Sequence, residues 1–179
     1  LENKKKFNQT LNKFLDFFEL PRCIHNINNG KNYFLISISN CGKLLKSEEE
    51  IVNNHQNYKI YDIFLVKKKL TANQVNQFNN IKKFEKKVKF LKKLDYRPLL
   101  DPNIKKIIKS ANVIIYGPGT QYSSLFPSYL TKDLGKIICR SKAKKFLITN
   151  IYYDNDIKKE TTSSIIKKFN YYLNNKGKY

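Results

Sequence analysis

The segment Ser110-Ala-Asn-Val-Ile-Ile-Tyr-Gly-Pro-Gly-Thr-Gln-Tyr-Ser-Ser-Leu-Phe-Pro-Ser-Tyr-Leu130 decides the fold of this chain of 179 residues. Its apolar run Val113–Tyr116 predicts a short buried strand. The strand stops at Gly117-Pro118-Gly119, and hydroxyl residues and an apolar segment that can begin a helix follow. This order can form an anion site, because glycine lets the backbone approach a ligand and the N–H groups of a helix start attract negative charge. Ser123 or Ser124 is the expected N-cap.

The bare glycine pattern has a second interpretation. An ordinary turn between a strand and a helix also needs glycine and binds nothing, and the pattern alone favours that interpretation. The next predicted elements are a helix over Lys132–Ser141, with Gly135 as a weak point inside it, and a strand over Lys145–Ile151 with Phe146-Leu147-Ile148 as its buried core. Because connections between parallel strands place their ends side by side, the loop Gly117–Thr120 and residues 150–156 should border one crevice.

The other segments predict an α/β domain covering residues 1–179, with a small antiparallel meander near the N-terminus. Apolar spacing predicts a helix over Lys4–Glu19 that packs on a sheet. The predicted meander consists of strands over 22–27, 33–39 and 43–46, with a hairpin turn at 28–30 and an acidic, solvent-exposed run at 48–50. A further strand is expected over 58–66, and helices over 71–94, 101–110 and 161–173.

The net charge of +21 invites a nucleic-acid interpretation. Only Arg22, Arg97 and Arg140 are arginines, whereas base readout and bidentate phosphate contacts favour arginine. Lysine therefore fills surface positions for the most part. The basic stripe within residues 70–95, which could be a helical insertion, leaves one alternative open: a non-catalytic module that binds nucleic acid or an anionic membrane surface. A plain surface helix with snorkelling lysines is the favoured interpretation of that stripe. The lysines are Lys82, Lys83, Lys86, Lys87, Lys89, Lys92 and Lys93.

Cysteine usage and hydropathy suggest a cytoplasmic protein. Cys23, Cys41 and Cys139 form a sparse, odd set that suits a reducing compartment rather than a disulfide framework. Cys23 and His25 are too far from other ligands in sequence to predict a zinc site. No apolar run approaches the roughly 20 residues of a membrane span, and no signal peptide is visible.

The amino-acid sequence of the central segment resembles that of the 2-phospho-L-lactate transferase and gluconeogenesis factor (CofD/YvcK-like) family. Residues 34–37, 42–51, 101–111 and 143–150 are also similar in sequence to the family. Nearly the whole chain therefore resembles the C-terminal half of the family's Rossmann-like domain, which has a mostly parallel sheet. The family's amino-terminal Gly-Gly-Thr-Gly and Asp-Asp-Gly-Gly segments have no counterpart here. In the central segment the matching positions are Gly117, Pro118, Gly119, Thr120, Tyr122, Ser123, Ser124, Pro127 and Leu130.

The resemblance implies a nucleoside-diphosphate ligand near this loop. One branch of the family moves a phospholactyl-type group from a GDP-linked donor to a deazaflavin, and the other binds UDP-sugars. The expected partners are that nucleotide and the missing N-terminal half of the same protein, with a homodimer also left open. The phosphate-binding set that this implies is Gly117, Pro118, Gly119, Thr120, Tyr122, Ser123, Ser124 and Asn150.

The catalytic residues cannot be assigned from the sequence. Asp154 and Asp156 could bind Mg²⁺ through oxygen ligands, although carboxylates also cluster at helix starts for electrostatic reasons. His25 and His55 lie far in sequence from Gly117, so no nucleophile–base pair is evident. Because group transfer needs donor, acceptor and activating group held together, we expect no transferase activity from this chain alone.

Overall fold

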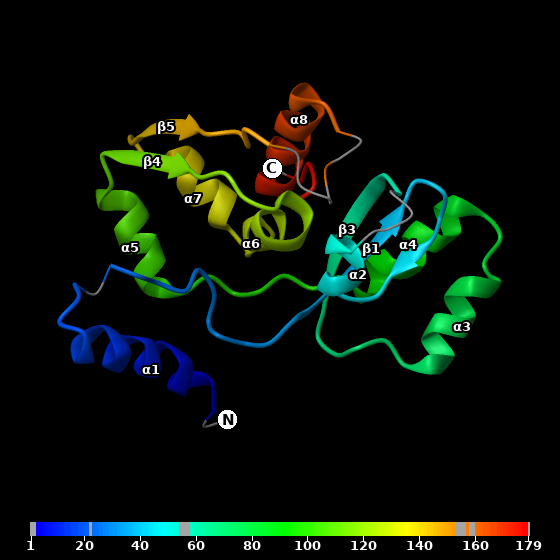
Figure 1. Ribbon diagram of the computed structural model, residues 1–179, viewed down its shortest axis with the longest axis horizontal. Coiled ribbons are helices and arrows are strands. Elements are labelled where there is room, and N and C mark those ends of the chain that lie inside the picture. The colour runs from blue at the N-terminus through cyan, green and yellow to red at the C-terminus, as the bar shows by residue number, and fades with distance from the viewer. Residues whose placement is uncertain (1–2, 22, 54–57, 153–156, 158–159, 179) are drawn as a thin grey trace.

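The strands form two separate sheets in the computed structural model, which describes residues 3–21, 23–53, 58–152, 157 and 160–178, with side chains from residue 9. Strands β1 (Phe34–Ser39), β2 (Leu44–Leu45) and β3 (Ile60–Val66) form an antiparallel sheet in the order β2-β1-β3. Strands β4 (Val113–Tyr116) and β5 (Lys144–Leu147) pair in parallel. The predicted α/β class, with a parallel sheet flanked by helices and an antiparallel meander, is confirmed (Figure 1).

The meander begins later than predicted. Residues 23–27 form no strand, and the predicted hairpin turn instead follows an irregular segment. Asn28 makes an isolated bridge to Leu100, and its side-chain oxygen accepts from the Gly30 N–H at 2.9 Å. Strands β1 and β3 pair from Phe34 opposite Val66 onwards, with a register irregularity at Ile38/Ser39. The prediction for 22–27 failed because alternation over six residues carries little information without a partner strand.

The antiparallel sheet is covered on one face by two helices, where a single helix was predicted over 71–94. These are α3 (Ala72–Asn80) and α4 (Phe84–Leu94). Thr71 and Gln74 form a capping box at the start of α3. The backbone is extended at Ile81 and at Lys83, which breaks the apolar stripe into two helices. The buried side chains of this face are Ile36, Ile38, Leu44, Phe64, Val66, Phe78, Val88 and Leu91.

The opposite face of β1 and β3 belongs to the main hydrophobic core. This core joins the sheet to α2 (Glu48–Val52), α6 (Phe126–Tyr129) and α8 (Thr162–Leu173). In α2, Glu48 and Glu49 are exposed as expected, and Glu50 accepts from the Lys46 N–H at 2.8 Å. Among the largest fully buried side chains are Phe64, Phe126, Tyr122 and Tyr172.

The parallel strands are less buried than predicted. Helix α5 (Pro102–Ser110) precedes β4, and helix α7 (Leu134–Arg140) lies in the crossover that joins β4 to β5. Tyr116 is buried, but Ile115 is 61% exposed and Phe146 is 53% exposed. Parallel strands carry apolar side chains on both faces because both faces are normally covered. In β4 and β5 both faces carry apolar residues, but no described residues cover the outer face.

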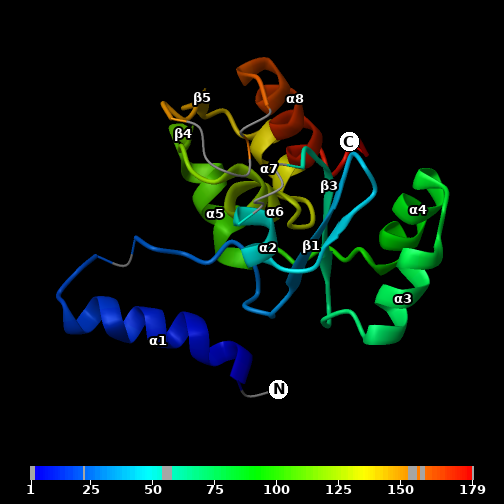
Figure 2. The ribbon, with the colours of Figure 1, turned by 45° about the vertical axis from the view of Figure 1, so that its right-hand side comes forward.

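Helix α1 (Asn3–Phe17) stands apart from both sheets (Figures 1 and 2). Leu15 is buried, whereas Phe14, Phe17 and Phe18 are exposed and their rings contact one another. The predicted packing of this helix on a sheet was therefore wrong for Phe14 and Phe18. No helix in the described part of the chain is long and apolar enough to span a membrane.

Candidate functional site

The Gly-Pro-Gly loop and the end of the next parallel strand meet as predicted. The Asn150 side chain accepts from the Gly119 N–H at 3.1 Å and donates to the Gly119 carbonyl at 3.0 Å. Gln121 closes the arrangement, since its side-chain amide donates to the Gly119 carbonyl at 3.0 Å and to the Asn150 oxygen at 3.2 Å. The loop is therefore held by two side-chain amides, one from the segment after β4 and one from the segment after β5.

Gly119 adopts a backbone conformation that suits glycine. Its φ is +157°, and a Cβ there would lie in ordinary contact with the Leu125 side chain, at 3.5 Å. The conformation, rather than a lack of space, restricts this position. Gly117 differs, because a Cβ there would have no neighbour within 4 Å among the described residues. Gly119 thus shapes the loop, and Gly117 leaves open space beside it.

The segment after the loop is a π-helix, η1 (Gln121–Leu125), whose N-cap is Thr120. The prediction that Ser123 or Ser124 is the N-cap was wrong, because the helix starts earlier. Thr120 Oγ1 and Ser124 Oγ share a hydrogen bond of 2.8 Å on the exposed side of this turn. A π-helix is often found at functional sites, and here it presents two hydroxyls next to the loop.

Two predicted site residues point into the core instead. Tyr122 is 1% exposed, and its hydroxyl donates to Glu160 Oε1 at 2.9 Å. Its ring packs edge-on against Phe126 and Tyr172, and Ser123 is also buried. Because Tyr122 and Ser123 are buried in the core, they anchor the segment that follows the loop. Of the other predicted positions, Pro118 and Ser124 are exposed, and Gly117, Gly119, Thr120 and Asn150 are half-buried.

Glu160 and Gln121 are functional candidates that sequence reasoning missed. Glu160 is buried, receives hydrogen bonds from Tyr122 and Ser164, and pairs with Lys59 at 3.2 Å. Gln121 is buried directly after the glycine loop. A polar side chain next to the loop was a visible signal for Gln121. The signal for Glu160 was absent, because two of its partners, Tyr122 and Lys59, come from distant segments.

The two residues predicted for metal binding, Asp154 and Asp156, are not covered. Asp154, Asp156 and His55 lie outside the described residues. Among the residues that are described, no group of three or more His, Cys, Asp or Glu side chains could hold a metal ion. Cys23, Cys41 and Cys139 are free and exposed.

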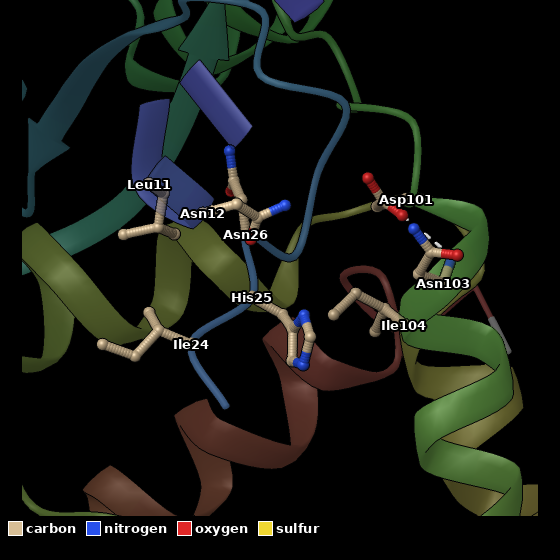
Figure 3. A pocket seen from close by; sticks show the side chains of 8 residues that line it. All are labelled: Leu11, Asn12, Ile24, His25, Asn26, Asp101, Asn103 and Ile104. Atoms are coloured by element: carbon tan, nitrogen blue, oxygen red, sulfur yellow. Dashed lines mark hydrogen bonds between the residues drawn. The ribbon is translucent and has the colours of Figure 1, made fainter. Parts of the chain in front are cut away.

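His25 was expected on the meander, and that placement was wrong. It lies in the irregular segment after α1 and lines a small cavity of about 60 Å³ with Asp101 and Ile104 (Figure 3). Asp101 caps α5 by accepting from the Asn103 N–H at 2.8 Å. The volume suits a few waters rather than a metabolite.

Residues 42–178, which include the loop and its Asn150 partner, match the sequence profile of the 2-phospho-L-lactate transferase CofD family. The chain belongs to this family. Among relatives, a gluconeogenesis factor of Listeria innocua is 42% identical over 50 residues, covering 28% of this chain and 16% of the relative. A gluconeogenesis factor of Halalkalibacterium halodurans is 35% identical over 79 residues, covering 43% of this chain and 24% of the relative.

The CofD-type fold is also seen in solved structures of a Bacillus halodurans protein. One superposes with a TM-score of 0.68 at 20% identity and covers 93% of this chain and 44% of that one. The other, described as a member of the UPF0052 family, has a TM-score of 0.68 at 18% identity and covers 95% and 46%. This CofD-family chain therefore spans less than half the length of these structures.

Proposed function

We propose that this chain contributes the phosphate-facing wall of a nucleoside-diphosphate site. The observation that carries the proposal is the Gly117–Thr120 loop, which Asn150 holds in a defined shape at the end of β4. Ligands of open α/β sheets bind beyond the carboxyl ends of the strands, and membership in the CofD family supports a phosphate-containing ligand.

The predicted residues then divide into two roles. Gly117, Pro118, Thr120 and Ser124 face the ligand. One of the two hydroxyls donates to a phosphate oxygen, while the other donates within the hydrogen bond that they share. Gly119 N–H is already bonded to Asn150. The other predicted residues therefore act as positioning residues, which hold the loop in shape without contacting the ligand themselves. They are Gly119, Asn150 and the buried Tyr122 and Ser123.

The ligand we propose is a GDP-linked donor or a UDP-sugar. The first would make the complete protein a transferase of a phospholactyl-type group, and the second a ligand-binding regulator. Mg²⁺ bound through Asp154 and Asp156 would fit either ligand, because divalent cations commonly accompany phosphates. The activating group for transfer remains to be supplied by other residues, so this chain alone should not catalyse transfer.

We further propose that additional polypeptide of the CofD type covers the open face of β4 and β5. Val113, Ile115 and Phe146 are exposed there, and contiguous apolar surface of this kind marks an interaction site. A covering strand and helix would complete both the sheet and the crevice. A homodimer through the same face is the competing arrangement, and the mass of the protein in solution distinguishes the two.

Titration calorimetry with GDP, UDP-N-acetylglucosamine and inorganic phosphate tests the nucleotide proposal on the full-length protein. Gly119→Val should weaken nucleotide binding by distorting the loop, and Thr120→Ala should weaken it by removing a donor. Lys105→Met on the exposed side of α5 serves as the matched control. Equal affinity in all four proteins, or no nucleotide binding at all, contradicts the proposal.

The basic-module alternative rests on the exposed lysines of α4 and the preceding turn. Lys87 donates to the Gly42 carbonyl at 3.0 Å and has a packing role. The exposed lysines are Lys82, Lys83, Lys86, Lys89, Lys92 and Lys93. Binding to RNA, DNA or anionic vesicles that survives physiological salt and is lost on exchanging these exposed lysines for glutamate would favour it.

A further inference from the structure

A cavity of about 520 Å³ lies between the outer edge of β3 and helix α8. None of the loop residues discussed above lines it. Its walls carry two lysines, two tyrosine rings, several hydroxyls and one carboxylate, that of Asp62, which is already paired with Lys176. The composition therefore combines positive charge, flat apolar surface and hydrogen-bond donors. The lining includes Tyr61, Thr161, Ser163, Lys167, Lys168 and Tyr171. Its volume falls in the range of small-molecule sites.

Lys168 is the central cation of this cavity. Its Nζ donates to the Tyr61 carbonyl and lies 5.7 Å from the centre of the Tyr61 ring and 5.9 Å from that of Tyr122. Burial lowers the pKa of this ammonium group, an effect that the nearby carboxylates Asp62 and Glu160 partly offset and Lys59 and Lys176 reinforce. An ammonium has three N–H donors, so two remain beyond the bond to Tyr61 as far as the described part of the chain is concerned.

The carboxylates near Lys168 already have other partners. Asp62 pairs with Lys176 at 3.1 Å and accepts from the Tyr172 hydroxyl at 3.1 Å. Glu160 pairs with Lys59 at 3.2 Å and accepts from Tyr122 and Ser164. Within the described residues, Lys168 Nζ forms no ion pair with a carboxylate within 4.0 Å. Partly buried charges are normally compensated by a partner, and here the partner position opens into the cavity.

We propose that the cavity between β3 and α8 is a second binding site, for a small phosphomonoester with an aromatic or other flat moiety. Lys168 anchors the phosphate and Lys167, which is exposed at the rim, adds a second positive charge. Thr161 and Ser163, at the start of α8, add hydroxyl groups beside it. A phosphate dianion matches two cations and several hydroxyl donors better than a carboxylate does. Tyr61 and Tyr171 provide the surfaces on which the flat moiety packs.

Phenyl phosphate is the probe that tests this site. Inorganic phosphate, which lacks the ring, and benzoate, which lacks the phosphate, test the two parts of the probe separately. Binding to the ¹⁵N-labelled full-length protein at physiological salt is followed by NMR. Phenyl phosphate should shift amide signals of Thr161–Tyr171 and Tyr61, and bind more tightly than either inorganic phosphate or benzoate. Lys168→Met keeps the aliphatic packing and should weaken binding at least about tenfold, because a charge-assisted hydrogen bond is lost.

Two further variants make the outcome decisive. Lys167→Met changes an exposed residue, so it should fold normally and still weaken phenyl phosphate binding several-fold. Lys105→Met, on α5, should bind like the unaltered protein. Binding unaffected by both Lys167→Met and Lys168→Met, shifts confined to other surfaces, or equal loss in Lys105→Met would overturn the proposal. Loss of nucleotide binding at the Gly117–Thr120 loop leaves these shifts in place, since the two sites share no lining residue.

Discussion

Asn150 and Gly119 are joined by two hydrogen bonds of opposite direction, although they lie 31 positions apart. The amide side chain of Asn150 satisfies both the N–H and the carbonyl of the glycine, as a neighbouring strand would. The segment after β5 therefore determines the shape of the loop that follows β4. The affinity for a ligand at this loop then depends on both segments.

Replacement of Asn150 tests this coupling. Asn150→Ala should lower nucleotide affinity about tenfold and the free energy of unfolding by about 1 kcal/mol, because two hydrogen bonds to a partly buried backbone are lost. Asn112→Ala, at an exposed position before β4, is the control and should change neither. Calorimetry and urea unfolding measure the two quantities. An unchanged affinity in Asn150→Ala would show that the loop keeps its shape without this contact.

Gly135 should be intolerant of any side chain. A Cβ at this position would lie 1.9 Å from the Leu173 carbonyl oxygen, so α7 and α8 must separate to admit it. Gly135→Ala should destabilise the protein by about 1–3 kcal/mol, the cost typical of an overpacked core. Gly117→Ala is the matched control and should leave Tm unchanged, because no atom of the described chain would lie within 4 Å of the added Cβ. Equal Tm values for the two variants would contradict this close approach.

The sequence identified most elements and the position of the loop, for reasons visible in individual residues. Asp101-Pro102 is a helix start that depends on local chemistry alone, and α5 begins there. Gly135 was interpreted as a weak point in its helix, whereas the structure uses the missing side chain for close packing against α8. Local propensity holds no information about a carbonyl 38 positions away.

Burial and site geometry were harder to predict than the elements. Val113, Ile115 and Phe146 have the sequence of a buried parallel sheet, yet the described chain covers one face of it. Tyr122 and Ser123 match the family sequence, but their side chains are buried in the core next to the loop rather than exposed at its surface. Their orientation depends on the pitch of the π-helix, which no pattern of apolar residues encodes.

Lys176 should contribute strongly to stability through a buried ionic network. It lies 3.1 Å from Asp62 and 3.2 Å from Asp95, and also donates to the Ile63 carbonyl at the edge of β3. Removing one partner of a buried pair leaves uncompensated charge and costs about 3–5 kcal/mol. Lys176→Met should therefore lower the denaturant midpoint strongly, while the exposed Lys178→Met should not. Similar midpoints would mean that the pair contributes little net stability.

Alkaline pH should destabilise the protein through its buried tyrosines. Burial raises the pKa values of Tyr116 and Tyr129 to about 12, from an ordinary value of 10.0. Between these values the unfolded state loses the phenolic protons while the folded state keeps them, so stability present below pH 10 is lost as pH rises towards 12. The lowered pKa of Lys176 has the opposite sign, adding stability as pH approaches 10.5. Tyr129→Phe should therefore reduce the loss of Tm above pH 10, and an unchanged slope would contradict this.

Hydrogen exchange of the loop amides tests the central claim most directly. Mass spectrometry of the full-length protein should be run with and without saturating UDP-N-acetylglucosamine, and again with GDP. The account predicts that one of these nucleotides slows exchange across Gly117–Ser124, while exchange in α3 and α4 stays unchanged. Nucleotide binding, verified by calorimetry, that protects other segments and leaves Gly117–Ser124 unaltered would contradict it.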